Sequence, residues 1–217
     1  MKNTKQAKSK LFSLKYLFYD FTKISAFLPG LIWFRPKFIY ENEKAKKKIR
    51  GGALVIANHC TFYDPVYLMS AIWYRRHHFV CLKQFFMSKA GWLFKLFLCI
   101  PIDTGNFGFG SFHEIVEHLQ AGELVSLYPE GHVNVEDTSI KAFKSGVVLM
   151  SLKGKSPIVP VYIEPKKHFY NRLKAVIGEP VDIVALYGEK PSFAQVEEIA
   201  RLLKEKEENL KNYIKEN

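Results

Sequence analysis

Short apolar runs alternate with helix-like stretches through most of this chain, and this alternation narrows the possible folds more than any other feature. We predict strands at 53–57, 79–82, 100–102, 124–128 and 158–163, with extended pieces at 175–177 and 181–183. We predict helices at 65–73, 92–98, 111–120, 143–152 and 191–213. Strands that alternate with helices form a sheet covered by those helices. We therefore expect a single-domain α/β fold with a mixed, mostly parallel sheet flanked by helices.

The N-terminal part has a different pattern. Apolar residues recur at helical spacing from Leu11 to Phe21, and lysines fall on another side. Asp20 and these lysines interrupt the roughly 18 apolar residues that a membrane span needs. Aromatic residues beside basic ones suit a bilayer interface, although a helix packed on the protein's own core fits nearly as well. We divide the chain into an N-terminal amphipathic, membrane-associating helical segment, 1–40, and an α/β domain, 41–217.

The charge of the chain indicates its partners. The formal net charge is +11 and 48% of the residues are hydrophobic, so the chain is not disordered and favours anionic partners. Nucleic acid, an anionic membrane surface and CoA-type or phosphorylated substrates all fit this charge. No nucleic-acid-binding motif is recognisable, so we expect no nucleic acid partner. The lysine-rich stretch 41–51 suits a solvated turn or contact with anionic headgroups.

Cysteine and histidine spacing argues against disulfides and metals. Cys60, Cys81 and Cys99 lie far apart without CxxC spacing, which indicates a reducing cytosolic environment. His77-His78 has no carboxylate at a sensible spacing, so we expect no metal site. The basic N-terminus lacks a small-residue cleavage site after an apolar stretch, so we expect no secretory signal peptide.

A histidine follows the first buried strand, and an aspartate comes five residues later. His59 and Asp64 would not face each other on one helix, so they meet only if His59 lies in a loop before the helix. Asp64-Pro65 supports this, because Asp is a favoured N-cap and Pro a favoured first helical residue. The carboxylate would then orient the imidazole, which could take a proton from a substrate hydroxyl. A strand-end histidine beside an ordinary cap is the alternative; Cys60 is a weaker candidate nucleophile, because adjacent residues point apart in extended chain.

The stretch 58–64, NHCTFYD, resembles the NHxxxxD motif of the glycerolipid acyltransferase family, typified by 1-acylglycerol-3-phosphate acyltransferase. Three further segments resemble family blocks in the same order: 100–103 (IPID), 128–131 (YPEG) and 158–163 (IVPVYI). The stretch 143–146 (FKSG) matches the helix start that follows the third block. The resemblance covers roughly residues 53 to 165, and four ordered blocks are far more specific than one.

The resemblance implies roles for individual residues. His59 would be the general base and Asp64 its orienting partner. Acceptor binding would fall to Lys83, Asp103, Glu130, Gly131 and His132. The donor would be acyl-CoA or acyl-carrier protein as co-substrate, with no cofactor. The implied protein is an O-acyltransferase of phospholipid biosynthesis, peripheral or monotopic on the cytoplasmic face of the membrane, with a lysophospholipid acceptor such as 1-acyl-sn-glycerol-3-phosphate.

Two positions depart from the family pattern. Thr104 stands where the second block normally ends in arginine, and His132-Val133 stands where the third block normally continues Thr-Arg. Arginine offers a bidentate fork to phosphate that these residues do not replace. A non-phosphatidate lipid acceptor therefore stays open as an alternative. So do a non-catalytic basic membrane-binding module and a thioester hydrolase that uses water.

Overall fold

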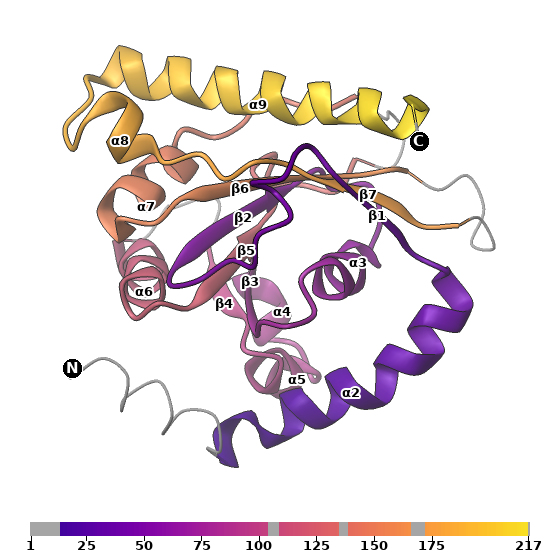
Figure 1. The fold of residues 1–217 in the computed structure, drawn as a ribbon. Coiled ribbons are helices and arrows are strands. Elements are labelled where there is room, and N and C mark those ends of the chain that lie inside the picture. The colour runs from indigo at the N-terminus through magenta and orange to yellow at the C-terminus, as the bar shows by residue number, and fades with distance from the viewer. Residues whose placement is uncertain (1–13, 104–108, 135–138, 166–171, 217) are drawn as a thin grey trace, which may run out of the picture.

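The most apolar strands lie at the centre of the sheet in the computed structural model. The structure describes residues 14–103, 109–134, 139–165 and 172–216. The seven strands are β1 (Lys37–Tyr40), β2 (Ala53–Ala57), β3 (His77–Leu82), β4 (Ile100–Ile102), β5 (Leu124–Leu127), β6 (Ile158–Ile163) and β7 (Lys174–Ile177). Their order is β1-β7-β6-β2-β5-β3-β4, and every neighbouring pair is parallel except β6 with β7. The predicted mixed, mostly parallel sheet is confirmed (Figure 1).

Helices cover both faces of this sheet. They are α2 (Leu14–Phe34), α3 (Asp64–Ala71), α4 (Lys83–Phe86), α5 (Gly91–Leu96), α6 (Phe109–Gln120), α7 (Gly146–Gly154), α8 (Ile183–Tyr187) and α9 (Phe193–Glu216). Alternate residues of β2 enter two cores, because successive side chains of a strand point to opposite faces. Leu54 packs with α6, α7 and α9, while Val55 packs with α3. Figure 1 shows α9 running over β6 and β7.

Sequence patterns predicted most helix boundaries. Gly122 ends α6 with a φ of 80°, and the amides of Gly122 and Glu123 donate to the carbonyls of Leu119 and His118 at 3.0 Å each. This bond pair is a Schellman motif. Ser192 caps α9: its hydroxyl accepts from the Gln195 amide, and the Gln195 side chain accepts from the Ser192 amide.

Three short elements differ from the prediction. Strand β1 and helix α4 have four residues each, too few for a periodic pattern to reveal. The prediction of extended chain over 181–183 is wrong only at Ile183, the first residue of α8; Val181 bridges to Ile158 and Asp182 is extended. The Asp182 side chain accepts a hydrogen bond from the Ala185 amide at 3.0 Å and so caps α8. Strand β1 pairs with β7, so residues 37–40 join the sheet and not the helical segment that precedes them.

Polar contacts attach α2 to the turn before β3. Asp20 accepts two hydrogen bonds from the Arg76 guanidinium, at 2.9 and 2.6 Å. The Tyr19 hydroxyl accepts from the His77 amide at 2.9 Å, and the Lys23 ammonium donates to the Arg75 carbonyl at 3.1 Å. These contacts explain why charged residues interrupt an otherwise apolar helix. Among the described residues, no helix has both the length and the apolar character to cross a bilayer.

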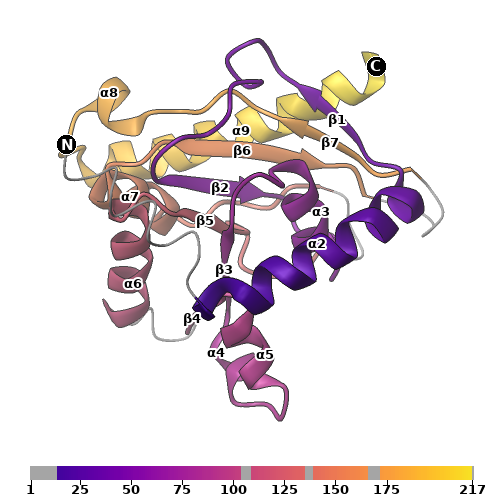
Figure 2. The same ribbon diagram turned by 60° about the horizontal axis from the view of Figure 1, so that its bottom comes forward.

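The outer side of α2 is apolar and exposed. Leu17, Phe21 and Ile24 recur at helical spacing there and are 62–71% exposed. Figure 2 shows α2 as a long helix beside the body of the sheet domain, where it also contacts α5. The helix is therefore amphipathic, as the sequence predicted, with its polar side held by the domain.

Candidate active site

One edge of the sheet gathers all the predicted site residues. The strands β2, β5, β3 and β4 are neighbours and run parallel, so their carboxyl ends meet at the same edge. His59 follows β2, Glu130 follows β5, Lys83 follows β3 and Asp103 follows β4. In sheets of this kind ligands bind just beyond the carboxyl ends of the strands. We call this side the carboxyl edge.

His59 and Asp64 meet in the loop between β2 and α3. The His59 Nδ1 atom lies 2.9 Å from Asp64 Oδ2. The same oxygen accepts from the amides of Cys60 and Thr61 at 2.7 and 2.8 Å, and Oδ1 accepts from the Thr61 hydroxyl at 2.7 Å. Asp64 is 1% exposed. Two amides, one hydroxyl and the imidazole surround this buried carboxylate and fix its position.

The predicted capping role of Asp64 is wrong. Asp64 is the first residue of α3, and Tyr63 precedes it as an N-cap without a side-chain hydrogen bond. The Asp64 carboxylate turns back to the loop because the amides of Cys60 and Thr61 and the imidazole all offer donors there. Pro65 occupies the first helical turn as expected.

The imidazole of His59 is held at Nδ1 by Asp64, while Nε2 has no hydrogen-bond partner among the described residues. A carboxylate with four donors acts as acceptor, so Nδ1 carries the hydrogen and Nε2 has a free lone pair. The ring stacks on Tyr128, with centroids 3.9 Å apart and planes inclined by 12°. The His59 side chain is 15% exposed. This arrangement can accept a proton from a group that approaches Nε2.

Cys60 is poorly suited to be a nucleophile. Burial, and then the charge of Asp64, raise the pKa of the Cys60 thiol to about 11. The Asn58 amide donates to its sulfur at 3.4 Å. A thiolate is the reactive form, so this cysteine stays protonated and unreactive near neutral pH.

Glu130 contacts the backbone of the base. Its carboxylate accepts from the His59 amide at 3.2 Å and from the Lys141 amide at 3.0 Å, and Glu130 is 4% exposed. The Asn134 amide donates to the His59 carbonyl at 2.7 Å. Both backbone polar groups of His59 are thus bonded to the chain after β5. The resemblance implied acceptor binding for Glu130, whereas its carboxylate here is engaged by two amides.

Gly131 turns the chain next to a lysine. Its φ is 77°, and a Cβ atom there would lie 2.8 Å from the Lys144 ammonium. His132 is exposed and its Nδ1 lies 3.0 Å from the Glu130 carbonyl, so that carbonyl fixes the hydrogen on Nδ1. The motif at 143–146 pointed to Lys144, but sequence reasoning gave it no role.

Lys83 and Asp103 lie further along the carboxyl edge. Leu82 pairs with Ile102 in the sheet, so the two residues that follow are side by side. Both side chains are exposed. Thr104, which replaces a family arginine, falls outside the described residues.

Comparison with known proteins agrees with this geometry. A model of the family described as acyltransferase matches residues 37–164, more than half of the chain. The chain belongs to the acyltransferase family. The resemblance to glycerolipid acyltransferases drawn from the sequence is thereby confirmed.

Several relatives of this acyltransferase are known. It is 29% identical over 168 residues to the 1-acyl-sn-glycerol-3-phosphate acyltransferase of Bacillus subtilis, covering 73% of this chain and 83% of the relative. It is 26% identical over 166 residues to the N-acylphosphatidylethanolamine synthase of Arabidopsis thaliana, covering 59% and 55%. The crystal structure of the 1-acyl-sn-glycerophosphate acyltransferase PlsC from Thermotoga maritima shares its fold, with a TM-score of 0.64, 18% identity, and coverage of 88% and 78%.

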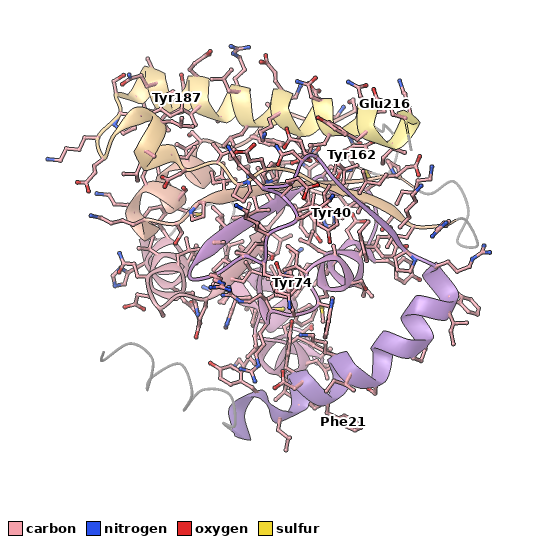
Figure 3. The ribbon with its side chains drawn as sticks, in the orientation of Figure 1. Phe21, Tyr40, Tyr74, Tyr162, Tyr187 and Glu216 are labelled. Carbon is pink, nitrogen blue, oxygen red and sulfur yellow. The ribbon has the colours of Figure 1, made fainter. Side chains whose placement is uncertain are left out.

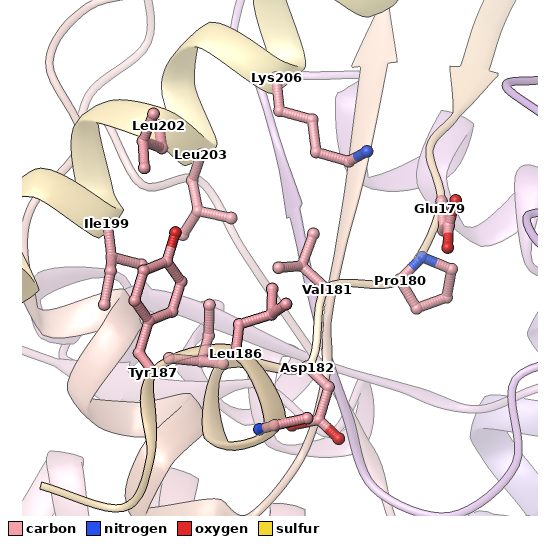
Figure 4. A pocket seen from close by; sticks show the side chains of 12 residues that line it. Glu179, Pro180, Val181, Asp182, Leu186, Tyr187, Ile199, Leu202, Leu203 and Lys206 are labelled. Carbon is pink, nitrogen blue, oxygen red and sulfur yellow. The ribbon is translucent and has the colours of Figure 1, made fainter. Parts of the chain in front are cut away.

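A pocket of about 420 Å³ in this acyltransferase lies away from His59. Figure 4 shows it between α8 and α9, with Val181, Leu186, Leu203 and Lys206 in its wall. Val181 pairs with the first residue of β6, so the pocket is near the amino ends of the central strands. The His59–Asp64 pair lies at the opposite edge of the sheet, so this pocket is separate from the candidate site.

Proposed function

We propose that the protein transfers a fatty acyl group from acyl-CoA or acyl-carrier protein to the hydroxyl of a lysophospholipid, most simply 1-acyl-sn-glycerol-3-phosphate. The observation that carries this proposal is the carboxylate-held imidazole of His59, whose second nitrogen has no hydrogen-bond partner among the described residues and whose side chain is 15% exposed. The activity in the name of the Bacillus subtilis relative supports the choice of acceptor.

The reaction follows from this arrangement in two steps. The acceptor hydroxyl gives its proton to His59 Nε2 while its oxygen attacks the thioester carbonyl. Asp64 stabilises the imidazolium that forms. The tetrahedral intermediate then collapses: the C–S bond breaks, and the departing thiolate takes the proton from Nε2. The products are an ester and a free thiol, and no protein nucleophile is needed.

Lysines replace the missing arginines in the binding of the acceptor phosphate. The Lys144 side chain lies beside Gly131, in the chain after β5 that bonds the backbone of His59. Lys83 follows β3, the strand next to β5. An ammonium is a point charge without the bidentate fork of arginine, so it holds a phosphate with less geometric selection. His132 adds a donor only when its ring is protonated, because the Glu130 carbonyl already holds the hydrogen on Nδ1.

The exposed apolar side chains support a membrane surface as the place of work. Trp33 is exposed on α2, and beyond that helix Phe62, Met87 and Trp92 are 77%, 80% and 58% exposed. Figure 3 shows Phe21 pointing away from the body of the protein. Aromatic and apolar side chains beside lysines insert at the headgroup boundary of a bilayer. We propose peripheral or monotopic attachment to the cytoplasmic face, so that the acceptor reaches His59 from one leaflet.

The test is a panel of acceptors with labelled acyl-CoA and acyl-carrier protein, read by mass spectrometry. The panel includes lysophosphatidate, other lysophospholipids and phosphatidylethanolamine, because one relative is named for acylation of that lipid. We expect His59→Ala to lower acyl transfer by about 10²–10⁴-fold while the fold is kept.

His113→Ala is the matched control, since His113 is exposed on α6 and its Nε2 lies 3.2 Å from the exposed carboxylate of Glu117. Unchanged turnover in His59→Ala would contradict the proposal. Thiol release that does not depend on any acceptor would favour a thioester hydrolase.

A further inference from the structure

Two histidines and a glutamate meet at the edge of the sheet opposite His59. The amino-edge cluster consists of His78, His118 and Glu123. His78 Nε2 and His118 Nδ1 lie 3.2 and 2.5 Å from the same oxygen, Glu123 Oε2. The two imidazole rings are tilted by 34°, with centroids 4.2 Å apart. One potential ligand atom from each residue lies within 4.8 Å of the others.

The fold brings these residues together from three places in the sequence. His78 is the second residue of β3 and pairs with Val125 of β5, so it lies beside the residue that precedes β5. That residue is Glu123, and the Schellman motif at Gly122 bonds its amide to the carbonyl of His118. The expectation that no carboxylate accompanies His77-His78 is therefore wrong, because a strand register that joins residues 45 positions apart was not visible in local spacing.

We propose that the amino-edge cluster binds one divalent transition-metal ion, with Zn²⁺ as the best fit. Two imidazole nitrogens and a carboxylate oxygen are ligands that Zn²⁺ accepts, at about 2.0–2.2 Å each. Tetrahedral ligands at that radius are about 3.3 Å apart, which the 3.2 Å between His78 and Glu123 already matches. The His118 side chain needs to withdraw by only about 1 Å to complete the set. Water would supply the fourth ligand.

Burial and charge also suit a metal. The His78 side chain is 5% exposed, so its ring is held firmly, while His118 and Glu123 are partly exposed and leave an entry path. The cluster carries one negative charge when both imidazoles are neutral. Arg75 lies near it and donates to the carbonyls of Gly51 and Gly122. This adjacent cation repels any divalent ion, so binding relies on the strong affinity of imidazole nitrogen for transition metals, which Mg²⁺ lacks.

The metal would have a structural effect. It would join the start of β3, the end of α6 and the turn before β5, whereas His59 lies beyond the other end of these strands. A strand of five residues spans roughly 16 Å, so the ion takes no part in acyl transfer. We expect metal binding to change stability and not the chemistry at His59.

The experiment uses the full chain after treatment with EDTA. Zn²⁺ is titrated by calorimetry, the melting temperature is followed with and without Zn²⁺, and Co²⁺ is added to read the visible absorption of a tetrahedral site. The wild type should bind one Zn²⁺ per chain and melt at a higher temperature with it. His118→Ala and Glu123→Gln should each weaken binding by at least about tenfold and remove the Co²⁺ bands. Mg²⁺ should have no effect.

His113→Ala is the control, because it removes an exposed histidine of the same helix that contacts Glu117 and not the cluster. It should bind Zn²⁺ like the wild type. Both cluster variants replace partly exposed side chains, and circular dichroism in EDTA verifies that they fold; if one does not, the other decides. The proposal is overturned if the wild type shows neither heat nor a melting shift, or if both variants bind Zn²⁺ as tightly as the wild type.

Discussion

The two edges of the sheet place the same kinds of side chain in opposite arrangements. At the carboxyl edge one imidazole contacts one carboxylate, and the Asp64 carboxylate also accepts hydrogen bonds from the loop amides. At the amino edge two imidazoles converge on one oxygen of Glu123. The first arrangement leaves one imidazole nitrogen for the proposed proton transfer. The second brings together the three side chains that we propose as metal ligands.

This difference shows that residue type alone does not decide what a histidine does. His59 stands in a loop whose amides hold its partner, so only one of its nitrogens is occupied. His78 stands inside a strand, where its side chain can meet only what the neighbouring elements bring to it. The groups around each histidine therefore determine whether it suits the proposed role of a base or that of a metal ligand.

The strongest test of the comparison is Asp64→Asn. An asparagine could place its oxygen at the amides of Cys60 and Thr61, but this neutral amide would favour the Nδ1–H form of His59 less and stabilise its imidazolium less than the carboxylate does. We expect the turnover of acyl transfer to fall by about 10³–10⁴-fold, measured by steady-state assay with lysophosphatidate. Glu117→Gln, an exposed change on α6, should stay within about twofold of the wild type. Equal turnover in the two variants would remove the orienting role of Asp64.

Glu130→Gln sharpens the comparison, because Glu130 reaches the base only through its backbone. One of the two amides that Glu130 serves, at His59 or Lys141, would face the donor end of the glutamine. We expect the free energy of unfolding to fall by about 1–3 kcal/mol in urea titrations. We also expect kcat to fall more than KM changes, since the base is displaced while acceptor contacts remain. A loss of stability with unchanged kcat would mean that Glu130 only holds the fold.

Glu207→Gln tests whether a third carboxylate contributes to acyl transfer at the carboxyl edge. Its effect on turnover should be the smallest of the three. Glu207 on α9 is fully buried, and the nearby backbone of Asn58 favours its charged form less than burial opposes it. Burial, reinforced by the charge of Glu130, raises the pKa of Glu207 well above its usual value of 4.5. The folded state thus keeps a proton that the unfolded state releases above that value, so stability falls as pH rises.

The uncharged glutamine removes this dependence. Glu207→Gln should equal the wild type in stability near pH 4 and exceed it by about 1–3 kcal/mol near pH 8, as measured by denaturant titration at each pH. Acyl transfer should stay within about threefold, since Glu207 does not contact His59. A variant that is less stable than the wild type at pH 8 would show that the carboxylate has a partner in solution.

Local sequence was sufficient for most of the fold and for the catalytic pair. The apolar run of β2 and the five-residue spacing from His59 to Asp64 are features of neighbouring residues, and the structure reproduces both. The short elements β1 and α8 were not predicted, because four or five residues carry no periodicity. The amino-edge cluster was not predicted for another reason: its members meet through strand register, which is a property of the whole sheet.

The bonds between the Pro129-Glu130-Gly131 turn and the backbone of His59 limit how this enzyme can change its specificity. Glu130 and Asn134 tie the loop that would hold the acceptor to the base itself. A mutation that widened the acceptor site by shifting this loop would also displace His59. Relatives built on this turn are therefore expected to acquire new lipid acceptors by exchanging exposed side chains such as His132 and Lys144, while the path of the main chain is inherited unchanged.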